Sequence, residues 1–286
     1  MTLILNNAET GSDGTTVTTG NSGGTNANAF DGVTIGANMT ETFSTTSPAH
    51  GSLAFKTALT STTTAITYLE WTSTTFGSVA VEVYGAVYLV ISNGGLGSPS
   101  SSLRFLRFMN GGTGGYGVKL ESGSGVQRVS VMDSAGTSVG TIGGTGSGLG
   151  AGAVGRIEFH FLFNTASGEV ARVKLFSADG TSEVATAATL TATNMGAGFD
   201  GVRIGCNTAN FSSTSGAAFW VDDIAFNTTA TDYLGPGPYS QPASSAAGPA
   251  GRIASVSSIS RLCGPWRRRR SGILVPRLWT PNGAVL

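Results

Sequence analysis

Charge, cysteine and helical periodicity are all scarce in this sequence. Charged residues make up 11 % of its 286 positions, well below the quarter that is typical of soluble proteins. The two cysteines, Cys206 and Cys263, are too few for a disulfide scaffold or a zinc site. No apolar run reaches the roughly 18 residues that a membrane-spanning helix needs. These absences argue against a helical cytosolic enzyme, a disulfide-stapled domain and a membrane-spanning protein.

Residue sets that carry catalytic chemistry are equally scarce. The histidines are His50, in a predicted turn, and His160, between two phenylalanines, and no Gly-x-Ser-x-Gly nucleophile motif is present. Glycoside hydrolysis needs two carboxylates about 5–10 Å apart. Glu70, Glu82 and Glu158 each stand alone in their predicted strands. We therefore expect a protein that is not an enzyme.

The net charge of zero conceals two oppositely charged regions. All 16 acidic residues lie at or before Asp232, whereas seven arginines follow position 250, including the run Arg267 to Arg270. Residues 1–236 read as one acidic domain, which is a poor candidate for binding nucleic acid. A Pro/Gly/Ser/Ala linker over 237–250 leads to a basic tail, 251–286, which does not read as an independent domain. The tail could bind nucleic acid or another acidic partner, be disordered, or be a reading-frame artefact.

The start of the chain bears on location. The first seven residues have no basic segment and no long apolar run, so no signal peptide is recognised. Low charge with many Gly, Ser, Thr and Val residues is nevertheless typical of extracellular β proteins and of virion proteins. We expect a virion or extracellular location. The alternative is a secreted protein whose signal lies outside this sequence.

Alternation with a period of two residues recurs along the chain, broken by clusters of Gly, Asn, Asp and Ser. It predicts strands over residues 3–5, 30–35, 52–56, 65–71, 78–91, 103–109, 117–120, 127–132, 201–206 and 218–226, with a three-strand meander over 156–184. Several of these strands have one strongly apolar face, which a second sheet must cover. The fold class is therefore all-β: a two-sheet antiparallel jelly-roll sandwich with a disordered or irregular C-terminal tail.

The strand order resembles the concanavalin A-like lectin/glucanase superfamily, in its LamG-like form. Three stretches carry the resemblance: 29–33 (Ala-Phe-Asp-Gly-Val), 53–56 (Leu-Ala-Phe-Lys) and 219–226 (Phe-Trp-Val-Asp-Asp-Ile-Ala-Phe). The last is similar to the closing strand of such proteins in actinobacterial genomes and phage tail regions. Glucanases of this superfamily place Glu-x-Asp-x-x-Glu on one strand, and no such run exists in this sequence. The resemblance thus implies a jelly roll that binds or assembles.

Calcium is the ion that this sequence favours, because loops at the ends of a sandwich supply carboxylate and carbonyl oxygens. The candidate ligands are Glu9, Asp31, Asp222 and Asp223. Strict alternation places Asp222 and Asp223 on opposite faces and Asp222 on the inward face of Ile224. A buried carboxylate there needs a partner: calcium, an arginine, or backbone amides.

A second resemblance also bears on calcium. Residues 5–9 and 221–224 resemble the ends of carbohydrate-binding-module sandwiches, in which an early Glu and a late Asp hold a structural calcium ion. The sequence departs from that pattern at Ala8, where an aromatic residue is usual.

A carbohydrate site is expected on the polar faces of the strands. In the predicted strand 78–91, Glu82, Tyr84 and Tyr88 lie opposite a row of valines. The candidate sugar-contacting residues are Tyr68, Glu82, Tyr84, Tyr88, Arg107 and His160. The same face could instead pack on a neighbouring subunit, which would make a homo-oligomer. We expect a phage or phage-derived virion component that contacts cell-surface glycan or other virion proteins; the alternatives are a secreted lectin-like module and a glycoside hydrolase relative.

Overall fold

The structure is a computed structural model of the chain. It describes residues 3–24, 27–61, 65–92, 102–123, 126–141, 148–163, 168–186, 190–192, 195–207 and 217–239. They belong to one compact unit, Met1–Pro242. The predicted tail and the linker from residue 240 onward lie outside the described residues. Within the described ranges, no helix is long and apolar enough to cross a membrane.

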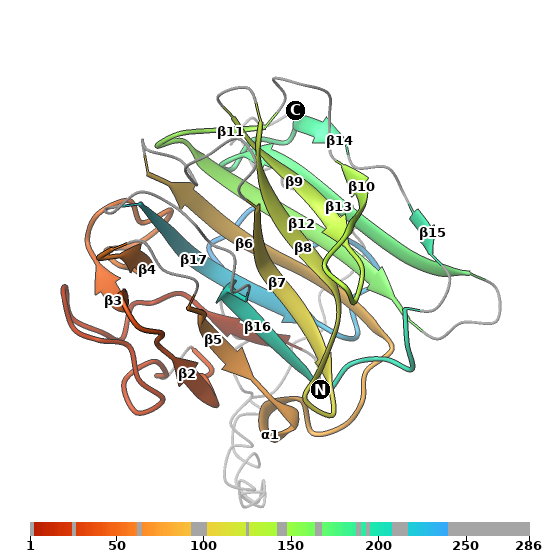
Figure 1. Ribbon diagram of the computed structural model, residues 1–286, viewed down its shortest axis with the longest axis horizontal. Coiled ribbons are helices and arrows are strands. Elements are labelled where there is room, and N and C mark those ends of the chain that lie inside the picture. Colours follow the sequence, from red (N-terminus) through yellow and green to blue (C-terminus); the bar gives the residue numbers. More distant parts are fainter. Residues whose placement is uncertain are drawn as a thin grey trace, which may run out of the picture. The chain divides into compact units, whose positions relative to one another are not determined.

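Two antiparallel sheets pack face to face (Figure 1). The nine-stranded sheet, here called the back sheet, contains β1 (Leu3–Asn6), β3 (Met39–Ser44), β4 (Ala54–Leu59), β6 (Glu82–Ile91), β12 (Val154–Leu162), β13 (Glu169–Ser177), β14 (Glu183–Thr186), β15 (Leu190–Ala192) and β17 (Ala218–Asn227). The eight-stranded front sheet contains β2 (Gly32–Thr34), β5 (Thr67–Trp71), β7 (Ser102–Asn110), β8 (Thr113–Gly123), β9 (Val126–Met132), β10 (Ser138–Thr141), β11 (Leu149–Gly150) and β16 (Gly201–Cys206). The jelly-roll sandwich predicted from the alternation is confirmed.

Aromatic side chains join the two sheets. Phe108 on β7 of the front sheet lies with its ring centre 4.9 Å from that of Phe161 and 6.0 Å from that of Phe159, both on β12 of the back sheet. Such pairs add to the free energy gained by burying the rings. Ile157 and Phe163 enter the same core, so alternate residues of this segment form one apolar row.

Some elements escaped the sequence pattern. The strands β3, β10, β11 and β15 and the single-turn helix α1 (Ser73–Phe76) were not predicted. The predicted strand 78–91 in fact begins at Glu82, and Val79 and Val81 are 50 % and 46 % exposed. An apolar residue before a strand therefore does not prove that the strand has begun.

The predicted alternation at Asp222 and Asp223 is wrong. The pairing of β17 with β6 shifts its register between Asp222 and Ala225, and Asp223 has a φ of 42°. This β-bulge inserts an extra residue and reverses which parity faces the core. Val221 and Ile224 both enter the core, whereas Asp222 turns to the outer face with Trp220.

Candidate functional site

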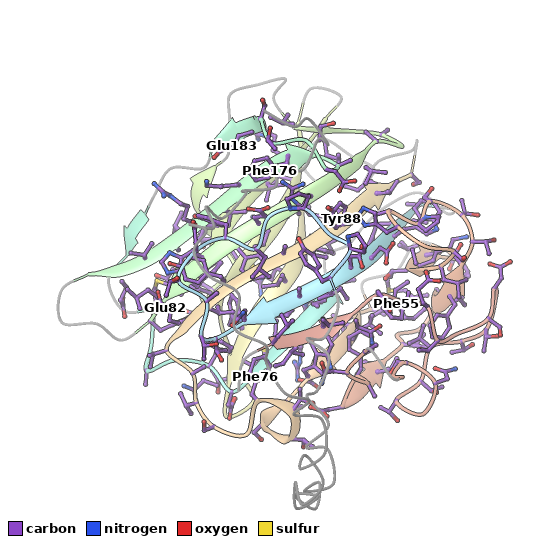
Figure 2. The ribbon with its side chains drawn as sticks, turned by 180° about the vertical axis from the view of Figure 1, so that it is seen from behind. Phe55, Phe76, Glu82, Tyr88, Phe176 and Glu183 are labelled. Atoms are coloured by element: carbon purple, nitrogen blue, oxygen red, sulfur yellow. The ribbon has the colours of Figure 1, made fainter. Side chains whose placement is uncertain are left out.

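The outer face of the back sheet is largely covered by the chain itself. Figure 2 looks onto this face and shows the segment after β17, residues 228–239, returning across it. Gly237 donates its backbone N–H to the Tyr88 hydroxyl over 2.8 Å. Tyr88 is 1 % exposed, and Arg156 and Glu158 are 2 % exposed each. A polysaccharide therefore has no access to the middle of this face.

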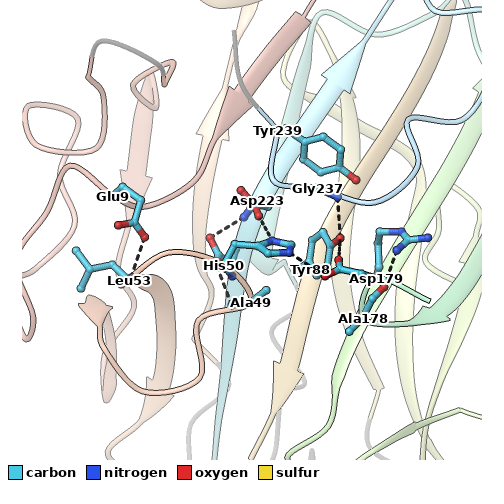
Figure 3. Close-up of polar contacts among 12 residues, drawn as sticks. Glu9, Ala49, His50, Leu53, Tyr88, Ala178, Asp179, Asp223, Gly237 and Tyr239 are labelled. Atoms are coloured by element: carbon cyan, nitrogen blue, oxygen red, sulfur yellow. Dashed lines mark hydrogen bonds and ion pairs between the residues drawn. The ribbon is translucent and has the colours of Figure 1, made fainter. Parts of the chain in front are cut away.

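His50 is the centre of a polar network beneath that segment (Figure 3). Its Nδ1 contacts Oδ2 of Asp223, and its Nε2 lies 3.2 Å from Oδ2 of Asp179. The Tyr88 hydroxyl donates to Oδ1 of Asp179 over 2.5 Å. Burial by itself would lower the pKa of His50, but the two carboxylates outweigh it and raise the pKa. The network ties the loop before β4, the turn after β13 and the bulge of β17 together.

The four carboxylates proposed as calcium ligands accept hydrogen bonds from the protein. Glu9 accepts from the amides of Ser52 and Leu53, and Asp222 accepts from those of Ala49 and His50. Asp31 caps α1 through Thr72 and Thr75, and Asp223 contacts His50. Among the described residues, no group of three or more His, Cys, Asp or Glu side chains is placed to hold a metal ion.

The residues proposed to contact sugar lie on two opposite faces. Glu82, Tyr84, Tyr88 and His160 project from β6 and β12 on the back sheet, whereas Tyr68 and Arg107 project from β5 and β7 on the front sheet. One site cannot contain both groups, since the core separates them.

The back-sheet group does not offer a free stacking surface. Tyr84 and His160 stack on each other with ring centres 4.1 Å apart, and Tyr233 meets Tyr84 edge-on at 5.7 Å. Oε1 of Glu82 forms a hydrogen bond 2.9 Å long with Nε2 of His160. Burial, followed by the charges of Glu82 and Asp232, raises the pKa of Tyr84. These three rings pack on one another and so do not form a free surface on which a sugar could stack.

The outer face of the front sheet is different, because it collects positive charge. Residues 1–239 contain nine lysines and arginines. Five of them share this face: Arg104, Arg107, Lys119, Arg128 and Arg203. Each stands next to residues that enter the core, so each side chain points outward. The strands of this face offset the five cations with two carboxylates, Glu70 and Glu121. A domain that is acidic as a whole thus has one basic, part-exposed face.

Three charged residues form a row across neighbouring strands. Glu70 on β5 faces Arg203 on β16, which faces Arg107 on β7. Arg203 donates from Nε to Oε1 of Glu70 over 2.7 Å, and its guanidinium lies 4.4 Å from the ring centre of Tyr68. Tyr68 is only 8 % exposed, since Arg203 covers its ring. A ligand would therefore meet the guanidinium rather than the face of the Tyr68 ring.

Arg104 and Arg107 have no carboxylate partner in the part of the chain that the structure describes. Arg104 donates to the carbonyl of Ala135 over 2.5 Å, and Arg107 donates to those of Ser134 and Gly114 over 2.6 and 3.2 Å. Burial, followed by the positive charges of Arg104 and Arg203, lowers the pKa of Arg107 below its usual value. Like charges held this close favour an anionic ligand.

The basic face continues over β8 and β9. Lys119 lies 3.1 Å from Oε1 of Glu121, and Arg128 lies 4.0 Å from Oε2 of the same carboxylate. Burial would raise the pKa of Glu121, but hydrogen bonds from Ser138 and Lys119 outweigh it and lower the pKa. One carboxylate is thus shared by two cations, which leaves positive charge on these strands as well.

A cavity of about 210 Å³ adjoins the basic face at the end of the β7–β8 hairpin. Gly114 and Ser134, whose carbonyls hold Arg107, line one side, and Phe108, Phe163 and Met195 line the apolar side. The cavity therefore adjoins the residues that hold Arg107.

Tyr68 and Arg107 were named as candidates from the sequence, but Glu70, Arg203, Lys119 and Arg128, which lie on the same face, were not. A signal was present, because each is a charged residue next to an apolar residue inside a predicted strand. The alternation could not show which strands belong to the same sheet, and only the pairing of β5, β16, β7, β8 and β9 brings them together.

Comparison with known proteins gives fold relatives only. No protein-family profile and no curated protein matches the chain. The endo-β-1,4-glucuronan lyase of the fungus Trichoderma reesei superimposes with a TM-score of 0.54 at 14 % identity, over 80 % of this chain and 96 % of the lyase. Cip1, a cellulose-induced protein, gives 0.52 at 16 % identity over 82 % and 100 % of the two chains. The PL-14 alginate lyase of the marine Aplysia kurodai gives 0.52 at 12 % identity over 79 % and 98 %.

These relatives confirm the concanavalin A-like jelly-roll fold and give no support to a phage-tail or actinobacterial context. The expectation of a non-enzymatic virion protein is wrong, because full-length neighbours in structure are polysaccharide lyases. That expectation rested on the absence of the paired carboxylates of a hydrolase. A lyase cleaves by elimination and does not need that pair.

Proposed function

We propose that the chain is a polysaccharide lyase that acts on a uronic-acid polymer at the outer face of the front sheet. One observation carries the proposal: five of the nine cations of residues 1–239 lie on this face, although the domain is acidic. A polymer with a carboxylate on its sugars is the ligand that such a face attracts. The full-length similarity to a glucuronan lyase and an alginate lyase supports the same substrate class.

The spacing of the cations suits a chain that runs across the strands. Arg203, Arg107, Lys119 and Arg128 stand on four consecutive strands, β16, β7, β8 and β9. Arg203 faces Arg107, whereas Lys119 pairs with Arg104 and Arg128 pairs with Glu121, so the cations follow a diagonal across the strands. A polymer that carries carboxylates at intervals can contact several of these cations as it crosses the face.

Elimination makes two demands that the row at Arg203 can meet. The proton at C5 becomes acidic when the neighbouring carboxylate is neutralised, and Arg203 or Arg107 can neutralise it by a bidentate contact. A base takes that proton, the electron pair forms the C4–C5 double bond, and the C4–O bond to the next sugar breaks. The leaving oxygen then accepts a proton.

Tyr68 is the residue that we assign to proton transfer. The reacting C5 atom is bonded to the carboxyl carbon, so the base must lie beside the arginine that binds the carboxylate. Tyr68 packs under Arg203, while Glu70 is ion-paired with it. Arg203, which binds the carboxylate, thus lies directly against Tyr68, which can carry a proton.

The test is incubation of the purified protein with sodium alginate and with glucuronan, followed by the ultraviolet absorbance of the unsaturated uronate. We expect product from at least one polymer, and a loss of roughly 100-fold or more in kcat for Tyr68→Phe or Arg203→Ala. Tyr84→Phe on the back sheet is the matched control and should retain full activity. Binding without an unsaturated product would make the protein a carbohydrate-binding module, and equal losses in Tyr84→Phe and Tyr68→Phe would place the site elsewhere.

A further inference from the structure

The turn between β9 and β10, residues 133–137, lies on the two arginines that have no carboxylate partner in the described structure. Arg104 donates to the carbonyl of Ala135, and Arg107 donates to the carbonyl of Ser134, the residue just before it in the chain. Two adjacent carbonyl oxygens therefore occupy two adjacent guanidinium groups. Neither contact neutralises the charge of the arginine.

The turn is held together by its own hydrogen bonds. The amide of Thr137 donates to Oδ1 of Asp133 over 2.8 Å, and the amide of Gly136 donates to the Asp133 carbonyl over 2.9 Å. These bonds join the turn to itself and would survive if it left the arginines. The hydrogen bonds that join residues 133–137 to β7 are those from Arg104 and Arg107.

Gly136 lets the turn come this close to Arg104. It has a φ of +83°, and a Cβ atom there would lie 2.0 Å from Nε of Arg104. A side chain at 136 would therefore push the turn and the guanidinium apart. Gly112, in the β7–β8 turn, has a similar φ of +79° but would place a Cβ in open space.

We propose that the carbonyl oxygens of Ser134 and Ala135 occupy the positions of two neighbouring substrate carboxylates, and that a uronate polymer displaces this turn when it binds. The inference rests on the proposed function. A guanidinium binds a carboxylate more strongly than a neutral carbonyl, with two parallel bonds in place of one. A neutral polysaccharide offers hydroxyl groups and cannot compete in this way.

The turn thus selects for charge as well as for shape. Only a ligand that carries two carboxylates as close together as the carbonyls of Ser134 and Ala135 can replace both at once. In the free protein the two arginines are hydrogen-bonded to the carbonyls of the turn. A ligand must break these hydrogen bonds before it binds, and this makes the binding free energy of every ligand less favourable. A variant that cannot close the turn should bind uronates more tightly.

The experiment compares the wild type, Gly136→Ala and Gly112→Ala in calorimetric titrations with an unsaturated alginate tetrasaccharide and with cellotetraose. We expect the Kd for the uronate to fall about tenfold in Gly136→Ala and to stay unchanged in Gly112→Ala. Cellotetraose should not bind tightly to either variant. A Gly136→Ala protein with equal or weaker affinity for the uronate overturns the proposal.

A crystal structure of the wild type with the same tetrasaccharide gives a second readout. We expect carboxylate oxygens where the carbonyls of Ser134 and Ala135 now contact the arginines; a bound uronate with both carbonyl contacts intact refutes the proposal. The two hypotheses fail separately. If a uronate moves the turn but is not cleaved, the lyase hypothesis is rejected and the displacement of the turn is retained. If a uronate is cleaved while the turn stays in place, the lyase hypothesis is retained and the displacement is rejected.

Discussion

Arg203 and Glu70 face each other across β16 and β5, with Nε and Oε1 2.7 Å apart, and their side chains are 26 % and 18 % exposed. The carboxylate therefore reduces the positive charge of the face at the point where substrate would bind. An ion pair of this exposure contributes little to the stability of the fold. Its main effect is on the electrostatic potential of the site.

Glu70→Gln should strengthen the binding of a uronate polymer at low salt and make that binding more sensitive to salt. The change removes one negative charge from the face while keeping an oxygen that can accept a hydrogen bond from Arg203. We expect KM to fall by about threefold to tenfold at low ionic strength and to return toward the wild-type value at about 0.5 M salt. Glu82→Gln removes the same charge from the back sheet and is the control. A KM that responds equally in both variants would contradict a site on the front sheet.

The buried pair of Arg156 and Glu158 leads to a prediction about stability. Arg156 donates from Nε to Oε1 of Glu158 over 2.8 Å, and both side chains are at most 3 % exposed. Arg156 also donates to the carbonyls of Ala178 and Gly180, which fixes the turn after β13. The pair and this turn lie on the covered face of the back sheet, away from the proposed active site.

Arg156→Met should lower the free energy of unfolding by about 3–5 kcal/mol, since it leaves the Glu158 carboxylate buried without its partner. The double variant Arg156→Met/Glu158→Leu should recover much of that loss, because both charges are then gone. Urea denaturation of the two variants measures the difference. A double variant less stable than Arg156→Met would show that the ion pair itself stabilises the fold.

Alternation along the chain was enough to predict the sandwich, because the same apolar faces recur in strand after strand. Ile157, Phe159 and Phe161 alternate in this way within the predicted meander, and the structure has all three in the core. Alternation failed at Asp222 and Asp223, because a β-bulge leaves no mark in the pattern of apolar residues. Residues after the bulge still alternate, but with the opposite parity.

The candidate site was harder to predict, because it depends on strand pairing. Tyr68 and Arg203 are far apart in the chain, and they are in contact because β5 pairs with β16. Tyr84 and His160 were correctly placed on one face, yet their rings stack on each other. Nothing in the sequence indicated that residues 228–239 would cover that face. Residue type and periodicity identify candidate side chains, while topology decides which of them share a surface.

Gly85 on β6 leaves room for the Phe159 ring in the core, which gives a third prediction. A Cβ atom at this position would lie 2.2 Å from Cζ of Phe159 and 2.9 Å from the carbonyl oxygen of Ala225. Gly85→Ala should therefore lower the free energy of unfolding by about 1–3 kcal/mol through overpacking. Gly150→Ala, whose Cβ would have its nearest neighbour 3.9 Å away, is the control and should change little. Thermal unfolding of both variants decides; equal stability would mean that Phe159 moves aside freely.

Glu41 gives the last prediction, which concerns pH. Its carboxyl is buried in β3 with the Thr57 hydroxyl donating to Oε2 over 2.6 Å, and burial raises its pKa to about 8. The unfolded chain releases this proton near the ordinary value of 4.5, whereas the folded protein holds it. Stability is therefore retained at low pH and lost as the pH rises from about 4.5 to about 8. Glu41→Gln does not titrate, so its stability relative to the wild type should rise by roughly 4 kcal/mol over that window. Urea denaturation at pH 5 and pH 8 measures it, and a difference between the two proteins that is independent of pH would show that Glu41 ionises normally in the fold.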